Sequence, residues 1–220
     1  MKLITRVDGR ALRHHFSYHW WVYALIVALS FAVWNLIYAQ TAYRAPGDKR
    51  IDLYVQTQMM ENDQSLARLR TLGAQAAPEI EEVNLISLLP PSAQDMYANV
   101  QLVTFMSARE GDIFVLAAED FKRFAAQGAF LPLEDALLTG KIGLALDEGL
   151  KPGYITVLEP QEEDGEKPVP RSRLYGLPLR GFPKAMELLG LIQQDMFLAV
   201  PYYTENPEST LAFISLLLKQ

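Results

Sequence analysis

Apolar residues are concentrated in one uninterrupted run near the start of the chain. Residues 20–38 read WWVYALIVALSFAVWNLIY and include no charged residue. A helix of that length spans roughly 29 Å, about the thickness of the hydrocarbon core of a bilayer. Aromatic residues stand at both ends of the run, as they do at membrane interfaces: Trp20, Trp21 and Tyr23 at one end, Trp34 and Tyr38 at the other. The pattern predicts a transmembrane helix over residues 20–38, which binds the lipid bilayer.

The residues that flank this run favour one orientation. Four basic residues precede it (Lys2, Arg6, Arg10 and Arg13), and three follow it (Arg44, Lys49 and Arg50). This bias predicts a cytoplasmic basic segment at 1–19, a linker at 39–50 and an extracytoplasmic domain at 51–220 of a single-pass cell-membrane protein. A cleaved signal peptide is the alternative, but the long leading segment and the length of the run favour retention.

Beyond the linker, strand-like and helix-like spacings alternate. Strands are predicted at 51–56, 83–89 and 112–117, each followed by a helix-like stripe of apolar residues, as at 65–76 and 120–127. Strand–helix alternation of this kind is typical of right-handed βαβ units on a parallel sheet. The fold class predicted is therefore α/β: a single three-layer α/β domain with a mostly parallel sheet, preceded by one N-terminal transmembrane helix.

The alternation of predicted strands and helices ends after residue 133. Two strands, at 154–158 and 174–179, are joined by a polar and proline-rich loop, which predicts a long-looped hairpin or extension. A further strand is predicted at 196–202. Asn206 and Pro207 then form a strong helix start, and the helix runs over 207–219.

Four short motifs in this order resemble a known family. They are GDIFVL at 111–116, QGAFLPL at 127–133, YGLPL at 175–179, and the closing helix that begins NPE at 206. Together they resemble the extracellular solute-binding proteins of ABC importers, which have the type 2 periplasmic-binding fold. The resemblance implies a non-catalytic binding protein with a sugar or peptide ligand, working with a transporter or another envelope protein.

The chain departs from that family in size. About forty residues separate Leu133 from Tyr175, too few for the second α/β lobe of a full member. The sequence therefore resembles one lobe of a type 2 periplasmic binding protein, tethered by a membrane helix. Enclosure of a ligand by hinge closure needs two lobes and is not expected of a single one.

Composition excludes several functions. The net charge is -6, and it divides into +3 for residues 1–40 and -9 for the rest, which argues against a nucleic-acid partner. The chain has no cysteine, and its histidines (His14, His15 and His19) all precede the apolar run. Catalytic triads, zinc sites and histidine general bases are thus not expected in the outer domain, and we predict no cofactor, no metal and no enzymatic activity.

The acidic residues at 162–166 are typical of a solvated loop rather than a calcium site.

Ligand-binding residues are expected beyond the carboxyl ends of the strands, where open α/β sheets bind ligands. The candidates are Gln56, Thr57, Gln58, Glu119, Asp120, Arg180 and Tyr202. Each also suits an ordinary role in a loop or a helix cap. The predicted function is a membrane-anchored extracytoplasmic binding protein; the alternative is a protein–protein interaction module of the cell envelope with no small-molecule ligand.

Overall fold

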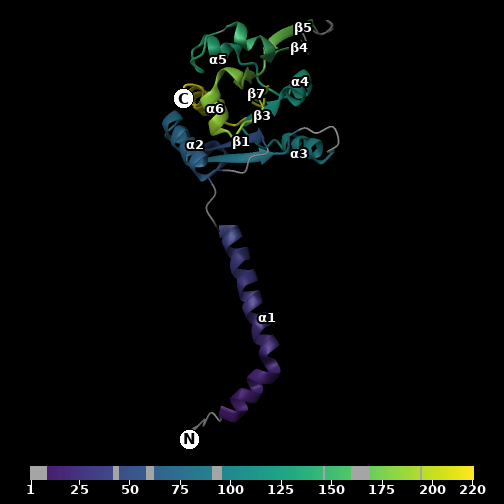
Figure 1. Cartoon of the computed structure of the whole chain (residues 1–220), viewed down its shortest axis with the longest axis vertical. Coiled ribbons are helices and arrows are strands. Elements are labelled where there is room, and N and C mark those ends of the chain that lie inside the picture. The colour runs from purple at the N-terminus through teal and green to yellow at the C-terminus, as the bar shows by residue number, and fades with distance from the viewer. Residues whose placement is uncertain are drawn as a thin grey trace. The chain divides into compact units, whose positions relative to one another are not determined.

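The computed structural model describes residues 9–41, 45–57, 62–90, 96–145, 147–159, 169–193 and 195–220. The chain divides into two compact units, Met1–Arg44 and Ala45–Gln220 (Figure 1). The buried clusters of the second unit contain only residues that follow Arg50, so this unit has a hydrophobic core of its own.

The first unit contains one long helix, α1 (Gly9–Thr41). Within it Trp20–Ala39 is long and apolar enough to cross a membrane, and the large apolar side chains of this stretch are exposed. The Ser30 hydroxyl donates a 2.8 Å hydrogen bond to the carbonyl of Ile26, one turn back. The helix therefore satisfies this hydroxyl internally, as a bilayer interior requires.

The second unit alternates strands with helices. Its strands are β1 (Arg50–Gln56), β2 (Glu82–Leu88), β3 (Ile113–Ala117), β4 (Tyr154–Glu159), β5 (Val169–Leu174), β6 (Leu177–Pro178) and β7 (Met196–Ala199). Its α-helices are α2 (Asp63–Ala76), α3 (Met96–Ser107), α4 (Ala118–Ala126), α5 (Glu134–Leu138), α6 (Pro183–Leu188) and α7 (Pro207–Leu218). Short 3-10 helices cover Gly47–Lys49, Glu148–Gly153 and Leu179–Gly181.

The main sheet of the described residues has five strands in the order β2-β1-β3-β7-β6. β1 runs parallel to β2 and β3, whereas β7 runs antiparallel to both of its neighbours, β3 and β6. Four strands thus share one direction, which confirms the prediction of a mostly parallel sheet. The reversed direction of β7 was not predicted.

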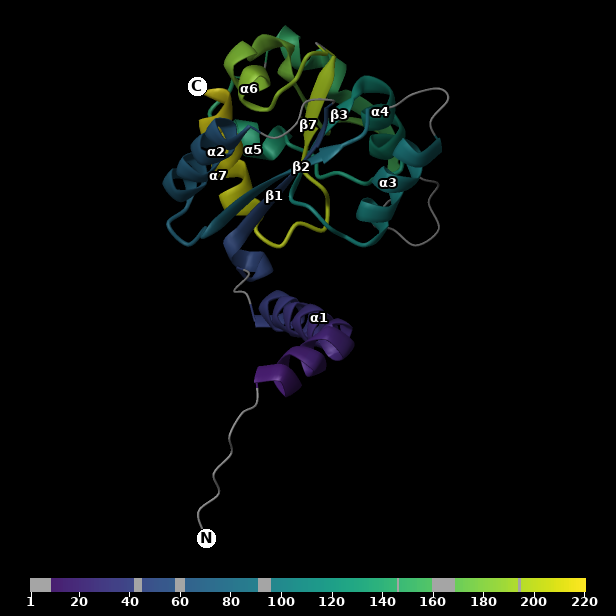
Figure 2. The same cartoon turned by 60° about the horizontal axis from the view of Figure 1, so that its bottom comes forward.

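Helices cover both faces of this sheet, so the domain has three layers. Figure 2 shows α2 and α7 on one side of the sheet and α3 and α4 on the other. Side chains alternate between the two faces along each strand. On β1, Ile51, Leu53 and Val55 belong to the core under α2 and α7, while Tyr54 belongs to the opposite, aromatic-rich core.

The predicted pairing of 154–158 with 174–179 is wrong. β4 pairs instead with β5, with Tyr154 opposite Leu174 and Glu159 opposite Val169, and β6 pairs with β7 in the main sheet. The apolar run at 174–179 thus contributes to both sheets: Leu174 ends β5 of the hairpin, and Leu177 and Pro178 form β6 of the main sheet. β5 reads VPRSRL and is mostly exposed, so it lacks the apolar alternation that marks a half-buried strand.

Gly153 provides a test of the junction between hairpin and main sheet. A Cβ at this position would lie 1.9 Å from the carbonyl oxygen of Gly176, a backbone atom that cannot move aside cheaply. We expect Gly153→Ala to lower the free energy of unfolding by about 2 kcal/mol through overpacking. Urea denaturation of residues 45–220 measures this loss. Gly181→Ala is the control, because a Cβ there meets nothing within 4 Å; equal stability of the two variants would contradict the junction described.

Candidate functional site

Polar groups from several elements converge at the carboxyl edge of the parallel strands. β1 ends there at Gln56 and β3 at Ala117, and β6 leads there into the 3-10 helix that contains Arg180. Because β7 is antiparallel, it begins at this edge, where Asp195 precedes Met196. This is the edge at which the sequence predicts a ligand site.

Gln56 and Asp120 lie together at this edge, but both are buried and occupied by internal hydrogen bonds. The Gln56 amide donates to Asp120 Oδ2 at 2.7 Å, and its oxygen accepts from the Ala117 N–H at 2.7 Å. Asp120 Oδ1 accepts from Arg123 at 2.7 Å. The Arg123 guanidinium also donates to Asn99 Oδ1 at 3.1 Å. These side chains therefore join β1, β3, α3 and α4.

The other predicted residues of β1 and α4 are placed differently. The Thr57 hydroxyl donates to the Gly190 carbonyl at 2.7 Å and so ties the end of β1 to the loop before β7. Gln56 and Thr57 also line a small cavity of about 110 Å³ with Leu191, Ile192 and Gln193. Glu119 is exposed in the first turn of α4. Gln58 lies outside the described residues.

A larger cavity of about 590 Å³ opens at the same edge, beside Arg180. We call it the edge cavity. Its charged lining residues are Asp147, Arg180 and Asp195, all exposed. Within the described ranges no hydrogen bond or ion pair engages the side chains of these three residues. Arg180 offers a fork of N–H donors and the two aspartates offer carboxylate acceptors.

The floor of the edge cavity is apolar. It is lined by Leu150 and Pro152 from the 3-10 helix before β4, by Phe182, and by Met196 and Phe197 of β7. Sequence reasoning found Arg180 but missed these residues and both aspartates. Asp195 was detectable in principle, because it directly precedes a predicted strand, but placing it at this edge requires the antiparallel direction of β7, which was not predicted. No comparable signal marks Asp147.

Tyr202 lies at the opposite, amino edge of the parallel strands, because β7 is antiparallel. It is about half exposed, and its ring meets that of Tyr203 edge-on at 5.4 Å between centroids. The Tyr203 hydroxyl donates to the Glu110 carbonyl at 3.0 Å. The structure therefore separates Tyr202 from the other candidate residues.

A compact polar cluster surrounds Asp112 at this amino edge. Its carboxylate accepts from the Asp52 N–H at 3.0 Å and from the Thr204 hydroxyl at 2.8 Å. Asp52 in turn accepts from Asn84 at 2.9 Å and contacts Arg50 at 3.0 Å. Burial raises the pKa of Asp112, the two hydrogen bonds lower it, the Asp52 charge raises it and Arg50 lowers it; the net direction is upward.

In the described part of the chain, no group of three or more His, Asp or Glu residues is placed to hold a metal ion.

Comparison with known proteins gives distant matches in structure alone. No protein-family model and no curated protein matches the sequence. Among solved structures, an ABC substrate-binding protein from Listeria monocytogenes in complex with cycloalternan is 18% identical with a TM-score of 0.37, covering 58% of this chain and 28% of that one. A family 1 extracellular solute-binding protein from Alicyclobacillus acidocaldarius is 18% identical, with a TM-score of 0.37 over 64% of this chain and 33% of that one.

A third match, a family 1 extracellular solute-binding protein from Bifidobacterium longum subsp. infantis, is 17% identical with a TM-score of 0.31, covering 60% of this chain and 28% of that one. The chain thus spans about a third or less of the length of each of these structures.

The network around Gln56 predicts a stability effect. Gln56→Ala leaves the Ala117 N–H and one Asp120 oxygen without partners in a buried setting, and each unsatisfied group costs about 1–3 kcal/mol. We expect the variant to lose about 2–4 kcal/mol in urea denaturation of residues 45–220. Gln75→Ala is the control, since Gln75 is exposed on α2. A loss no greater than that of the control would assign Gln56 a role other than structure.

Asp112 predicts a pH dependence. The pKa of the Asp112 carboxyl is raised in the folded protein, so the folded state binds the carboxyl proton more tightly than the unfolded chain does. The contribution of Asp112 to the free energy of unfolding therefore falls as pH rises through the raised pKa. Asp112→Asn removes that loss. We expect the unfolding free energy of the variant, relative to the unmodified domain, to increase between about pH 4 and pH 7. Chemical denaturation at stepped pH measures this difference. An unchanged or opposite trend, or the same trend in the exposed control Glu119→Gln, would contradict it.

Proposed function

We propose that the chain is a membrane-anchored, non-catalytic binding protein whose outer domain takes a small solute in the edge cavity. The observation that supports this most directly is the cavity itself: about 590 Å³, with an apolar floor and three charged side chains without partners among the described residues. Ligand sites are typically concave and mostly apolar, with a few polar groups that fix the orientation of the ligand.

The chemistry of the lining favours a solute with several hydroxyl or amide groups. The Arg180 guanidinium donates hydrogen bonds, whereas Asp147 and Asp195 accept them. A sugar hydroxyl both donates and accepts, so it suits such a mixed set. The apolar surface of Phe182 and Pro152 suits the C–H face of a sugar ring. We therefore expect an oligosaccharide, with a short peptide as the second choice.

Anchoring through α1 completes the proposal. The span Trp20–Ala39 is sufficient in length and composition, and the charge bias favours a cytoplasmic N-terminus. We therefore propose the division made from the sequence: a basic segment at 1–19, a transmembrane helix at 20–38, a linker at 39–50 and a binding domain at 51–220. A transporter or another envelope protein is the expected partner of such a domain.

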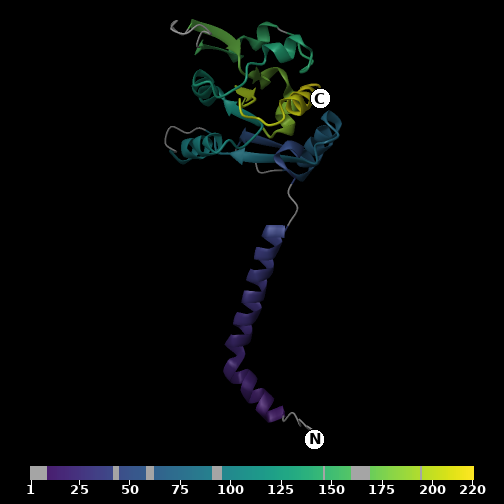
Figure 3. The same ribbon diagram turned by 180° about the vertical axis from the view of Figure 1, so that it is seen from behind.

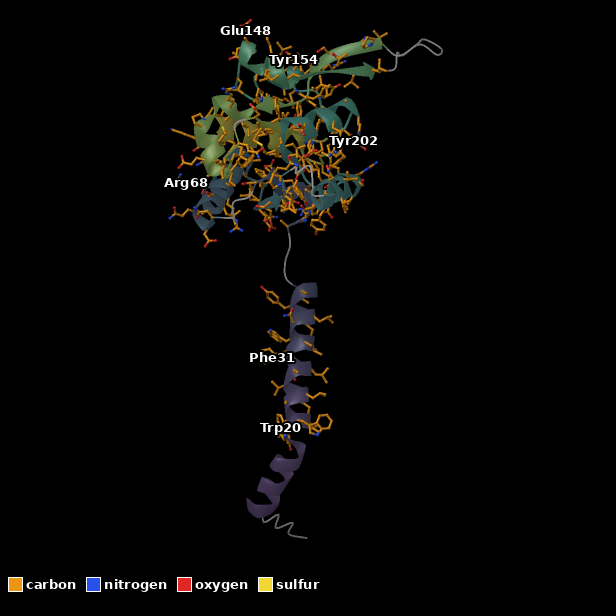
Figure 4. The ribbon with its side chains drawn as sticks, turned by 45° about the vertical axis from the view of Figure 1, so that its right-hand side comes forward. Trp20, Phe31, Arg68, Glu148, Tyr154 and Tyr202 are labelled. Carbon is orange, nitrogen blue, oxygen red and sulfur yellow. The ribbon has the colours of Figure 1, made fainter. Side chains whose placement is uncertain are left out.

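Calorimetric titration of residues 45–220 against linear and cyclic oligosaccharides and short peptides tests the proposal. We expect saturable binding by at least one compound. Arg180→Ala and Asp195→Asn should each weaken it about tenfold, equivalent to about 1.4 kcal/mol, because each removes a hydrogen-bonding group of the edge cavity. Arg68→Ala is the matched control, since Arg68 is an exposed arginine on α2 (Figure 4) and does not line the edge cavity.

Two outcomes would contradict the edge cavity as the binding site. One is binding that Arg180→Ala and Arg68→Ala weaken equally. The other is the absence of binding by a folded domain across the whole panel, which would favour the alternative, an envelope interaction module with no small-molecule ligand.

A further inference from the structure

The two strands of the β4–β5 hairpin present different outer edges. The Tyr175 N–H donates to the Gly153 carbonyl at 3.1 Å, which makes these two residues a hydrogen-bonded pair. Hydrogen-bonded and non-hydrogen-bonded pairs alternate along an antiparallel ladder. Thr156 lies opposite Ser172, three residues farther along, so this pair is non-hydrogen-bonded. The N–H and C=O groups of Thr156 and Ser172 therefore point outward, toward opposite edges of the hairpin.

The outer edge of β5 is largely closed. The outward N–H of Leu174 donates to Glu134 at 2.9 Å, and its carbonyl accepts from the Leu133 N–H at 2.7 Å. Pro170, the next outward position after Ser172, has no N–H to offer. Proline at an outward position is a common protection of an edge strand against pairing.

The outer edge of β4 has no such protection. Its outward positions include Thr156 and Leu158, both exposed, and Leu158 is 64% accessible. Beyond the ladder with β5, no hydrogen bond among the described residues engages the backbone of either residue. Two N–H donors and two carbonyl acceptors therefore face outward along this edge.

A cavity of about 860 Å³ lies beside this edge, and we call it the hairpin groove. Three consecutive residues of β4, Thr156 to Leu158, line it together with Arg173 of β5 and Tyr175, so it reaches the edge of β4 and also extends over a face of the hairpin. Figures 1 and 3 both show α4 next to the hairpin, and α4 contacts β4.

The wall of the hairpin groove opposite β4 is mainly apolar. It includes Phe130, Leu131 and Pro132, which follow α4, and Tyr202, which is 53% exposed. Figure 4 shows Tyr154 on the hairpin and Tyr202 on the body of the domain. An exposed apolar surface beside unpaired backbone groups is the combination that an added strand satisfies.

We infer that the hairpin groove binds an extended segment of a partner protein, which adds to β4 as a further strand. The unpaired groups of Thr156 and Leu158 hydrogen-bond its backbone, and its alternate side chains, which are apolar, contact Val157, Phe130 and Tyr202. This surface shares no residue with the edge cavity. The inference therefore goes beyond the proposed solute site and does not depend on it.

Selection of a phage-displayed library of twelve-residue peptides on the full-length chain in nanodiscs tests this inference, after removal of peptides that bind empty nanodiscs. The enriched peptide is synthesised and its affinity measured by fluorescence anisotropy. Thr156→Pro removes an outward N–H donor from the β4 edge and no donor from the ladder. The matched control is Ser172→Pro, which removes the outward N–H of the residue directly opposite. Pro170 shows that the hairpin accommodates proline at such a position.

We expect Thr156→Pro to weaken binding at least tenfold and Ser172→Pro to change it less than twofold. A peptide N-methylated at alternate residues should also lose at least tenfold, because it lacks donors for the strand edge. Circular dichroism of both variants confirms that they are folded.

Three outcomes would overturn the inference. The first is no enrichment of any peptide. The second is a selected peptide whose affinity the two proline variants change equally. The third is concentration-dependent dimerisation of the chain that Thr156→Pro abolishes, which would place a second copy in the groove instead of a partner.

Discussion

Burial of the central strands on both faces is the constraint on which the domain depends. All residues of β1 from Ile51 to Gln56 are buried, and the interiors of β3 and β7 are equally inaccessible. Full burial of one large apolar side chain contributes about 1.5–3 kcal/mol, so a sheet of this kind needs helices against both faces. Asp52 and Gln56 are the polar exceptions on β1. Each is hydrogen-bonded within the domain, because a buried polar group without a partner costs more than the bond contributes.

The direction of β7 decides which groups share an edge of this sheet. Because β7 is antiparallel, its start brings Asp195 and Met196 to the carboxyl edge beside Arg180, and its end carries Tyr202 to the amino edge. Most of the edge cavity is thus formed by the segments that follow β6 and that precede β7 and β4. At the ends of β1 and β3, the polar groups of Gln56 and Ala117 are already hydrogen-bonded within the Gln56–Asp120 network. A ligand at this edge meets mainly connecting segments, together with Pro178 of β6 and Met196 and Phe197 of β7, which agrees with the general placement of binding residues on loops over a rigid scaffold.

Local pattern was enough to predict β1, β2, β3 and the closing helix α7, since each has an apolar run or stripe bounded by turn residues. It was not enough for β5, whose Arg171, Ser172 and Arg173 carry no strand signal, nor for the short helices α5 and α6. The direction of β7 depends on contacts with β3, about eighty residues earlier, and no local signal encodes it. The same limit applies to Gln56: its hydrogen-bond partners Ala117 and Asp120 lie 61 and 64 residues later in the chain, and no local pattern reveals such contacts.

Two adjacent stretches of one segment of the chain line the edge cavity and the hairpin groove. Asp147, Gly149, Leu150 and Pro152 line the edge cavity. β4 begins directly after the 3-10 helix that ends at Gly153, and its residues Thr156 to Leu158 line the hairpin groove. The close approach of Gly153 to the Gly176 carbonyl leaves little freedom at the joint between them. This tight packing at Gly153 fixes where the 3-10 helix ends and where β4 begins.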